Sequence, residues 1–234
     1  MTPSDTMLYV PSAALTTYAD VSVVCRPLET VTVRKDGRVV RWRHPADAKR
    51  DKVAYLTEDR KGKGLLLDNV LRENVTLQAL EHFAKPFVDL RAEQGALERA
   101  VDEFDVRVRN LEVPAKALSG GNQQKVVLAK LMLTDPDVVI LDEPTRGIDV
   151  GTKRQIYFYV AELLAKGVAV VVISSELPEI LGLANRVVVM RSGVITGTLS
   201  GADLNEETIM AYATGLLSQH QQAQPGEVGA HIGL

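Results

Sequence analysis

The stretch Leu118–Asp149, "LSGGNQQKVVLAKLMLTDPDVVILDEPTRGID", decides the fold class of this chain. Ser119, followed by two glycines, predicts the start of a helix, because a serine hydroxyl can accept from free backbone N–H groups of the first turn. The apolar run Val138–Leu141 predicts a strand covered on both faces. Asp142 and Glu143 then stand at its carboxyl end, where open α/β sheets bind ligands. The stretch therefore predicts an α/β fold that presents a helix start and two carboxylates.

The residue types suit a phosphate and a metal ion. An aspartate after a strand can hold Mg²⁺ directly or through water, and the next carboxylate can orient an attacking water. Gly120 and Gly121 let the backbone come close to an anion at the positive end of a helix. Each pattern alone also fits a plain capped helix or a solvated Asp-Glu turn. Their spacing within Leu118–Glu143 favours the functional interpretation.

The amino-acid composition limits the classes of protein to which this chain can belong. The chain has 234 residues, of which 46% are hydrophobic, enough for one substantial core. Its formal net charge of -3 argues against a broad nucleic-acid surface, and the single Cys25 cannot form an internal disulfide. No apolar stretch reaches the roughly 20 residues that span a bilayer, and Asp5 stands where a signal peptide carries Lys or Arg. We therefore expect an intracellular protein that reaches a membrane only through a partner.

Periodicity divides the chain. Residues 31–43 predict a hairpin, 52–56 a buried strand, and 70–83 and 91–107 two helices. Beyond residue 138, apolar strands alternate with helices, which predicts parallel βαβ units. The expected organisation is an unassigned segment 1–30, a partial domain 31–215 with a helical lobe at about 65–117, and a disordered tail 216–234.

Three motifs resemble those of a known family, the ATP-binding subunits of ABC transporters. "LSGGNQQ" resembles the family signature, "VVILDEP" the Walker B strand and "GIDV" the D-loop. "YLTEDRKGKGLLL", "EPTRGIDVG" and "ISSELPEILGLANRVVVM" resemble the sugar-importer branch, the ribose, galactoside and xylose type. In that branch two ATPase halves are fused in one chain, and the motifs here are similar to those of the second half. The match covers roughly residues 34–215.

The resemblance implies a P-loop NTPase-like ABC ATPase domain, with a parallel sheet core and a helical lobe. The signature residues would contact ATP held by another ATPase unit: Ser119, Gly120, Gly121, Asn122 and Gln123. The remaining implied roles are metal binding for Asp142, catalysis for Glu143 and for Ser175 at the switch position, the Q-loop position for Glu58, and the D-loop contact across the dimer for Asp149.

The resemblance also implies cofactors and partners. ATP and Mg²⁺ are the expected cofactors. A second ABC ATPase unit with an intact Walker A loop and the transmembrane permease subunits are the expected partners. A periplasmic sugar-binding protein would act indirectly, and no nucleic acid is expected. The implied location is cytoplasmic, peripheral on the inner face of the cell membrane.

One family element has no counterpart in the sequence. A phosphate loop requires G-x-x-x-x-G-K-[ST], whereas the only Gly-Lys pair, Gly62-Lys63, is followed by Gly64. For residues 60–64 we expect a solvated basic turn instead. The sequence thus predicts an ATPase domain that is incomplete at its N-terminal side and hydrolyses little ATP alone.

Two interpretations stay open. The chain is either an ATPase subunit of a sugar importer that supplies a signature surface, or a non-catalytic truncated remnant or accessory module that docks on a partner ATPase or transporter. A chromosome-maintenance ATPase is disfavoured, because long heptad arms and a basic stripe are absent from the sequence.

Overall fold

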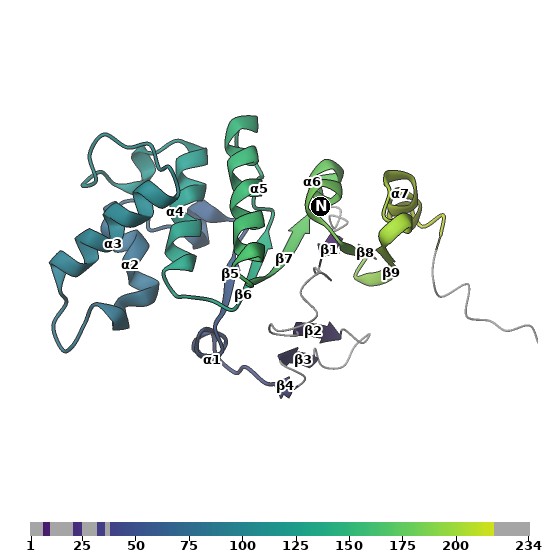
Figure 1. Ribbon diagram of the computed structural model, residues 1–234, viewed down its shortest axis with the longest axis horizontal. Helices are drawn as coiled ribbons and strands as arrows, with labels where there is room; N and C mark the ends of the chain where they lie inside the picture. Colours follow the sequence, from purple (N-terminus) through teal and green to yellow (C-terminus); the bar gives the residue numbers. More distant parts are fainter. Residues whose placement is uncertain (1–6, 10–20, 25–31, 36–37, 218–234) are drawn as a thin grey trace, which may run out of the picture.

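The computed structural model describes residues 7–9, 21–24, 32–35 and 38–217. Its main element is a six-stranded sheet in the order β5-β6-β7-β1-β8-β9, which runs across the molecule in Figure 1. The strands are β5 (Val53–Leu56), β6 (Val138–Asp142), β7 (Ala169–Ser174), β1 (Met7–Tyr9), β8 (Arg186–Arg191) and β9 (Val194–Ser200).

The strands β5, β6 and β7 are parallel, as the alternation of strands and helices predicts. Leu56 pairs with Leu141, and Leu141 with Val172. All three side chains are almost completely buried, because helices cover this part of the sheet and only apolar side chains tolerate that position. The carboxyl ends of the three strands therefore meet at one edge.

The strand β1 lies in a segment that the sequence left unassigned. It pairs antiparallel with both β7 and β8, so these two strands point the same way although one position separates them. A crossover that skips a position leaves two open strand edges, and Met7–Tyr9 pairs with part of each. The sheet is thus mixed around a parallel core, and β9 adds an antiparallel outer strand.

A second, three-stranded sheet contains β2 (Val21–Val24), β3 (Thr32–Lys35) and β4 (Arg38–Val40), all antiparallel. The pair β3–β4 confirms the hairpin predicted at residues 31–43. Lys35 donates from Nζ to the Asp137 carboxylate at 2.9 Å, which links this hairpin to the residue before β6.

Seven α-helices occur in the part of the chain that the structure describes: α1 (Pro45–Arg50), α2 (Leu71–Thr76), α3 (Leu90–Glu103), α4 (Gly120–Met132), α5 (Val150–Ala165), α6 (Leu177–Leu183) and α7 (Glu206–Thr214). The helix expected at 70–83 is α2 followed by a 3₁₀ segment, Leu77–His82, with non-helical angles at Ala79. The helix expected at 91–107 ends at Glu103, because Asp105 takes a left-handed conformation with φ +48°.

Two apolar clusters hold the fold together. The larger joins α2, α3, α4 and α5 to the parallel strands, with Leu71, Leu97 and Leu128 among its buried side chains. The smaller lies among α6, α7, β8 and β9 around Val187 and Ile209. Figure 1 shows α2 and α3 beyond β5 at one end of the molecule and α7 at the other.

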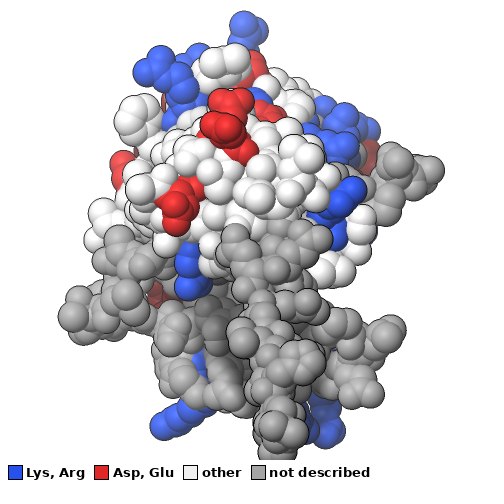
Figure 2. Space-filling model, turned by 90° about the vertical axis from the view of Figure 1, so that its right-hand side faces the viewer, with Lys and Arg blue, Asp and Glu red and all other residues white. Residues whose placement is uncertain are grey.

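The charged side chains on the face beside β9 and α7 are scattered. Figure 2 shows acidic and basic side chains of the described residues interspersed with uncharged ones on this face. Among the described helices, none combines the length and the apolar character that crossing a bilayer requires. The predicted tail 216–234 falls outside the described residues from position 218 onward.

Candidate functional site

The two carboxylates of the Walker B-like run lie at the edge where the parallel strands end. Asp142 is the last residue of β6, and Glu143 follows with a left-handed backbone, φ +47°. Glu143 donates its backbone N–H to the Ile173 carbonyl at 2.8 Å, and its Oε1 accepts from the backbone N–H of Ser175 at 3.0 Å. The structure thus brings together the two predicted catalytic positions, Glu143 and Ser175, and a strained backbone at Glu143 is typical of functional sites.

Tyr55 adds a side chain that the sequence analysis missed. Its hydroxyl donates to Oδ2 of Asp142 at 2.6 Å. Partial burial, and then this hydrogen bond, raise the pKa of Tyr55 to about 12, so the hydroxyl remains a donor at neutral pH. A signal was available, because β5 and β6 were both predicted strands and Tyr55 stands next to the end of β5.

The signature begins helix α4 as expected. Ser119 is the N-cap, and its Oγ accepts from the backbone N–H of Asn122 at 3.4 Å. A Cβ atom on Gly120 would lie 2.8 Å from a terminal nitrogen of Arg60, and one on Gly121 would lie 2.6 Å from Oγ1 of Thr152. Close packing within this chain therefore disfavours a side chain at Gly121, and at Gly120 a side chain would displace the end of Arg60; the sequence indicated only a ligand as the reason for both glycines.

The next two signature residues bind their own chain. The Asn122 side chain accepts from the backbone N–H of Arg107 at 3.0 Å and donates to the Arg107 carbonyl at 3.1 Å. Gln123 is buried and donates from Nε2 to the Ala115 carbonyl at 3.2 Å. These amides fix the start of α4 to the segment that follows α3, which is a structural task the sequence analysis did not foresee.

Asp149 begins helix α5 beside the signature. It accepts from the backbone N–H of Thr152 at 3.0 Å and from the Thr152 hydroxyl at 2.7 Å, and these bonds lower the pKa of Asp149. A hollow opens between the two helix starts, lined in part by Ser119, Asn122, Asp149 and Thr152. The structure thus places the predicted D-loop residue and the predicted signature on one cavity. Polar side chains and helix starts at its wall suit an anion.

Glu58, at the predicted Q-loop position, is bound to the loop before α5. Its Oε2 lies 2.9 Å from a terminal nitrogen of Arg146. The turn expected to be solvated and basic is a π-helical turn, Arg60–Gly64. Lys61 and Lys63 are exposed as expected, but Arg60 donates to the Arg146 carbonyl at 3.0 Å and to the Gly147 carbonyl at 3.4 Å. That expectation was therefore wrong for Arg60.

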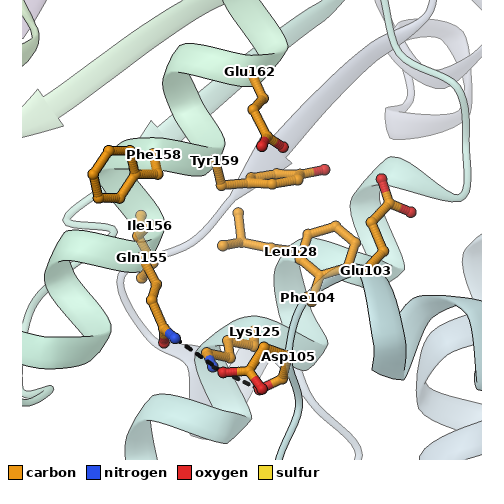
Figure 3. A pocket seen from close by; sticks show the side chains of 10 residues that line it. All are labelled: Glu103, Phe104, Asp105, Lys125, Leu128, Gln155, Ile156, Phe158, Tyr159 and Glu162. Atoms are coloured by element: carbon orange, nitrogen blue, oxygen red, sulfur yellow. Dashed lines mark hydrogen bonds and ion pairs between the residues drawn. The ribbon is translucent and has the colours of Figure 1, made fainter.

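A second pocket adjoins the hollow between α4 and α5, shown in Figure 3. At one end Lys125 donates to the Asp105 carbonyl at 2.7 Å, and Gln155 donates to the Asp105 carboxylate at 2.9 Å. The Gln155 hydrogen bond, and then the Lys125 ammonium group 3.3 Å from the same carboxylate, lower the pKa of Asp105. The ring centroids of Phe104 and Tyr159, two residues that line the pocket, lie 4.5 Å apart (Figure 3). The network ties α4 and α5 to the end of α3.

A carboxyl group is buried on α6. Glu179, on α6, is 1% exposed, and neither of its carboxyl oxygens has a hydrogen-bond partner among the described residues. The hydroxyl of Thr145 is buried and unpartnered in the same sense. Burial raises the pKa of Glu179 and outweighs the opposite effect of the nearby Ser174 and Thr145 hydroxyls, so the neutral carboxylic acid is favoured.

Asp142 is a strand-end carboxylate that could hold a metal ion. No cluster of three or more His, Cys, Asp or Glu side chains with metal-binding geometry occurs within the described ranges. Mg²⁺ usually takes one or two carboxylates and completes its coordination with waters and phosphate oxygens. A single strand-end carboxylate such as Asp142 therefore suits a cation that arrives with a nucleotide.

Comparison with known proteins places these features in context. The family described as ABC transporter matches residues 24–146. The ribose import ATP-binding protein RbsA of Bacillus licheniformis is 44% identical over 190 residues, which cover 81% of this chain and 38% of that protein. A putative ribose/galactose/methyl galactoside import ATP-binding protein of Burkholderia lata is also 44% identical over 190 residues, covering 80% and 37%. The chain thus spans less than two fifths of the length of these relatives.

Solved structures share the fold. The dimeric post-hydrolysis state of the ATP-binding cassette MJ0796 bound to ADP and Pi aligns with a TM-score of 0.63 at 20% identity, covering 78% of this chain and 76% of that one. The ATP-binding cassette MJ1267 aligns with a TM-score of 0.65 at 19% identity, covering 79% and 77%. The sheet and the helices described above are therefore those of an ATP-binding cassette.

Proposed function

This chain belongs to the ABC transporter family, and from that premise we propose that it is the ATP-binding subunit of an ABC-type sugar importer. The relatives that support a sugar as the transported substrate are named for ribose or galactoside import and are 44% identical to this chain. In this proposal the chain lies on the inner face of the cell membrane, in contact with permease subunits and with a second ATPase unit. A periplasmic sugar-binding protein acts on the same transporter without touching this chain.

The observation that carries the proposal is the shared hollow between the signature and the D-loop. Ser119 and Asp149 each begin a helix at its wall. Backbone N–H groups at a helix start attract phosphate oxygens, because those groups lack partners within the helix and the helix dipole is positive there. We propose that Ser119, Gly120 and Gly121 contact the phosphates of an ATP that the second ATPase unit holds.

The carboxylates serve a separate site at the end of β6, since neither Asp142 nor Glu143 lines the hollow. In this proposal Asp142 holds Mg²⁺, which would neutralise charge on the phosphates, and the Tyr55 hydroxyl orients the Asp142 carboxylate. Glu143 orients a water, and its contact with the Ser175 backbone keeps the carboxylate in place. These residues would act on a nucleotide bound to this chain, which has no G-x-x-x-x-G-K-[ST] loop in its sequence. We therefore propose that the chain alone hydrolyses little ATP.

Mixing experiments test this division of labour. ATP turnover is measured for the purified chain, for a complete ABC ATPase unit with its own phosphate loop, and for the mixture. We expect little turnover by the chain alone and a clear stimulation in the mixture. Ser119→Arg should remove the stimulation, because the larger side chain blocks the hollow, whereas Glu143→Gln should largely retain it.

The outcomes separate the two interpretations of the sequence. Turnover by the chain alone that Glu143→Gln abolishes contradicts the proposed division. A stable complex with the partner unit and no stimulation favours the accessory module. No complex and no stimulation contradict the importer subunit itself.

A further inference from the structure

The turn Arg60–Gly64 is anchored at both ends. At its start the Asp59 carboxylate accepts from the backbone N–H of Gly62 at 2.9 Å. At its end the Gly64 carbonyl accepts from Nζ of Lys130 at 2.9 Å, and Lys130 is a buried residue of α4. The backbone that carries Arg60 is therefore held against α4.

The Arg60 guanidinium reaches the loop before α5. One terminal nitrogen donates to the Arg146 carbonyl at 3.0 Å, and the other donates to the Gly147 carbonyl at 3.4 Å. The Nε atom is buried and has no hydrogen-bond partner among the described residues. A planar guanidinium can serve two neighbouring carbonyls at once, whereas a lysine offers a single ammonium group.

The same guanidinium packs against the signature. A Cβ atom at Gly120 would lie 2.8 Å from the Arg60 terminal nitrogen and 3.5 Å from the Gly147 carbonyl oxygen. The terminal nitrogen that meets such an atom is the one that donates to the Gly147 carbonyl, so a shift of this nitrogen would disturb that bond. One side chain thus joins three segments: the turn after β5, the start of α4 and the loop that leads to Asp149.

The neighbouring ion pair is a weaker tie between the same loops. Glu58 and Arg146 lie 2.9 Å apart, but their side chains are 53% and 67% exposed. Solvent screens the attraction in exposed ion pairs of this kind, so such a pair fixes the distance between two loops only weakly. Arg60, which is partly buried and bound to backbone atoms, is the better candidate for setting the spacing.

We propose that Arg60 is a positioning residue of the composite nucleotide site. Its guanidinium sets the distance between the Ser119–Gly121 turn and the Arg146–Asp149 loop, which contribute Ser119 and Asp149 to the wall of the shared hollow. This inference rests on the proposed function, because the spacing affects turnover only if the hollow receives a partner's nucleotide. Arg60 itself touches no nucleotide in this scheme.

A double-mutant cycle tests the contact without any activity. Urea unfolding is measured for the native chain, Gly120→Ala, Arg60→Ala and the double variant. The added methyl group should lower the folded-to-unfolded ratio about tenfold with Arg60 present and leave it nearly unchanged without Arg60. If the effects of Gly120→Ala and Arg60→Ala on the free energy of unfolding are additive, the proposal is overturned. If Arg60→Ala does not fold, Arg60→Met, which keeps much of the stem, replaces it in the cycle.

A kinetic experiment tests the consequence for the site. Turnover is measured in the mixture with a complete partner ATPase unit for native chain, Arg60→Lys and Lys63→Ala, the last being an exposed residue of the same turn. For Arg60→Lys we expect kcat to fall about tenfold while KM for ATP changes less than about twofold, because a misplaced signature acts after the partner has bound ATP. Lys63→Ala should match the native chain.

The experiments distinguish a failure of the proposed function from a failure of the positioning role of Arg60. If the native chain gives no stimulation, the proposed function fails and the role in the composite site fails with it, while the unfolding cycle still decides whether Arg60 packs on Gly120. If the native chain stimulates and Arg60→Lys stimulates equally, the proposed function stands and the positioning role is refuted.

Discussion

Gly121→Ala places a methyl group against Thr152. The new Cβ atom would lie 2.6 Å from Oγ1, 3.1 Å from Cγ2 and 3.2 Å from Cβ of Thr152. Thr152 is short and its hydroxyl donates to Asp149, so the side chain cannot turn away without breaking that bond. Overpacking of this kind costs about 1–3 kcal/mol.

The higher helix propensity of alanine opposes this steric cost. Alanine favours the helical conformation over glycine by about 1 kcal/mol. We therefore expect Gly121→Ala to change the free energy of unfolding by a net loss of about 0–2 kcal/mol. Gly95, inside α3, supplies the matched control, because a Cβ atom there would meet only the flexible end of Arg99 at 3.5 Å. Gly95→Ala should gain about 0.5–1 kcal/mol.

Urea unfolding followed by circular dichroism measures both variants. The difference between Gly121→Ala and Gly95→Ala isolates the steric contribution, about 1–3 kcal/mol. In a Thr152→Ala background, which removes the two nearest atoms, Gly121→Ala should approach the behaviour of the control. Two results would refute the reasoning: equal stabilisation by both alanines in the native background, or a Gly121→Ala penalty that persists unchanged without the threonine.

Three further predictions concern the core, the buried carboxyl and the start of α5. Leu141→Ala should cost about 2–5 kcal/mol in urea unfolding because the side chain is fully buried, whereas Val150→Ala, at a residue 74% exposed, should cost little. Burial raises the pKa of Glu179, so the contribution of Glu179 to the stability of the native chain should be fully present below its ordinary pKa of 4.5 and be lost as pH rises through the folded pKa. Glu179→Gln should flatten that dependence, and identical pH profiles would contradict the assignment. Asp149→Ala should speed hydrogen exchange at the Thr152 amide at neutral pH and lose its effect as pH falls through the lowered pKa of Asp149; unchanged exchange at pH 7 would count against the cap.

Much of the site was predictable because its signals are local. The Ser119 cap and the apolar strand before Asp142 depend on residues within a few positions of one another. The hairpin at β3–β4 and the parallel order of β5, β6 and β7 follow from periodicity and from the alternation of strands and helices.

The contacts that were missed join residues far apart in the sequence. Tyr55 binds Asp142, 87 positions away, and Arg60 binds the Arg146 carbonyl, 86 positions away. The strand β1 fills a gap between β7 and β8 that exists only once the crossover has formed. Periodicity carries no information about which distant group a side chain meets.

The sequence by itself determined the family, the parallel strands and the helix start that carries the signature, because caps, apolar runs and glycine turns act over a few residues. Only the tertiary structure decided why the signature needs its glycines. Arg60 and Thr152 approach Gly120 and Gly121 from segments that meet them after folding, and the room left for a side chain is a property of that packing.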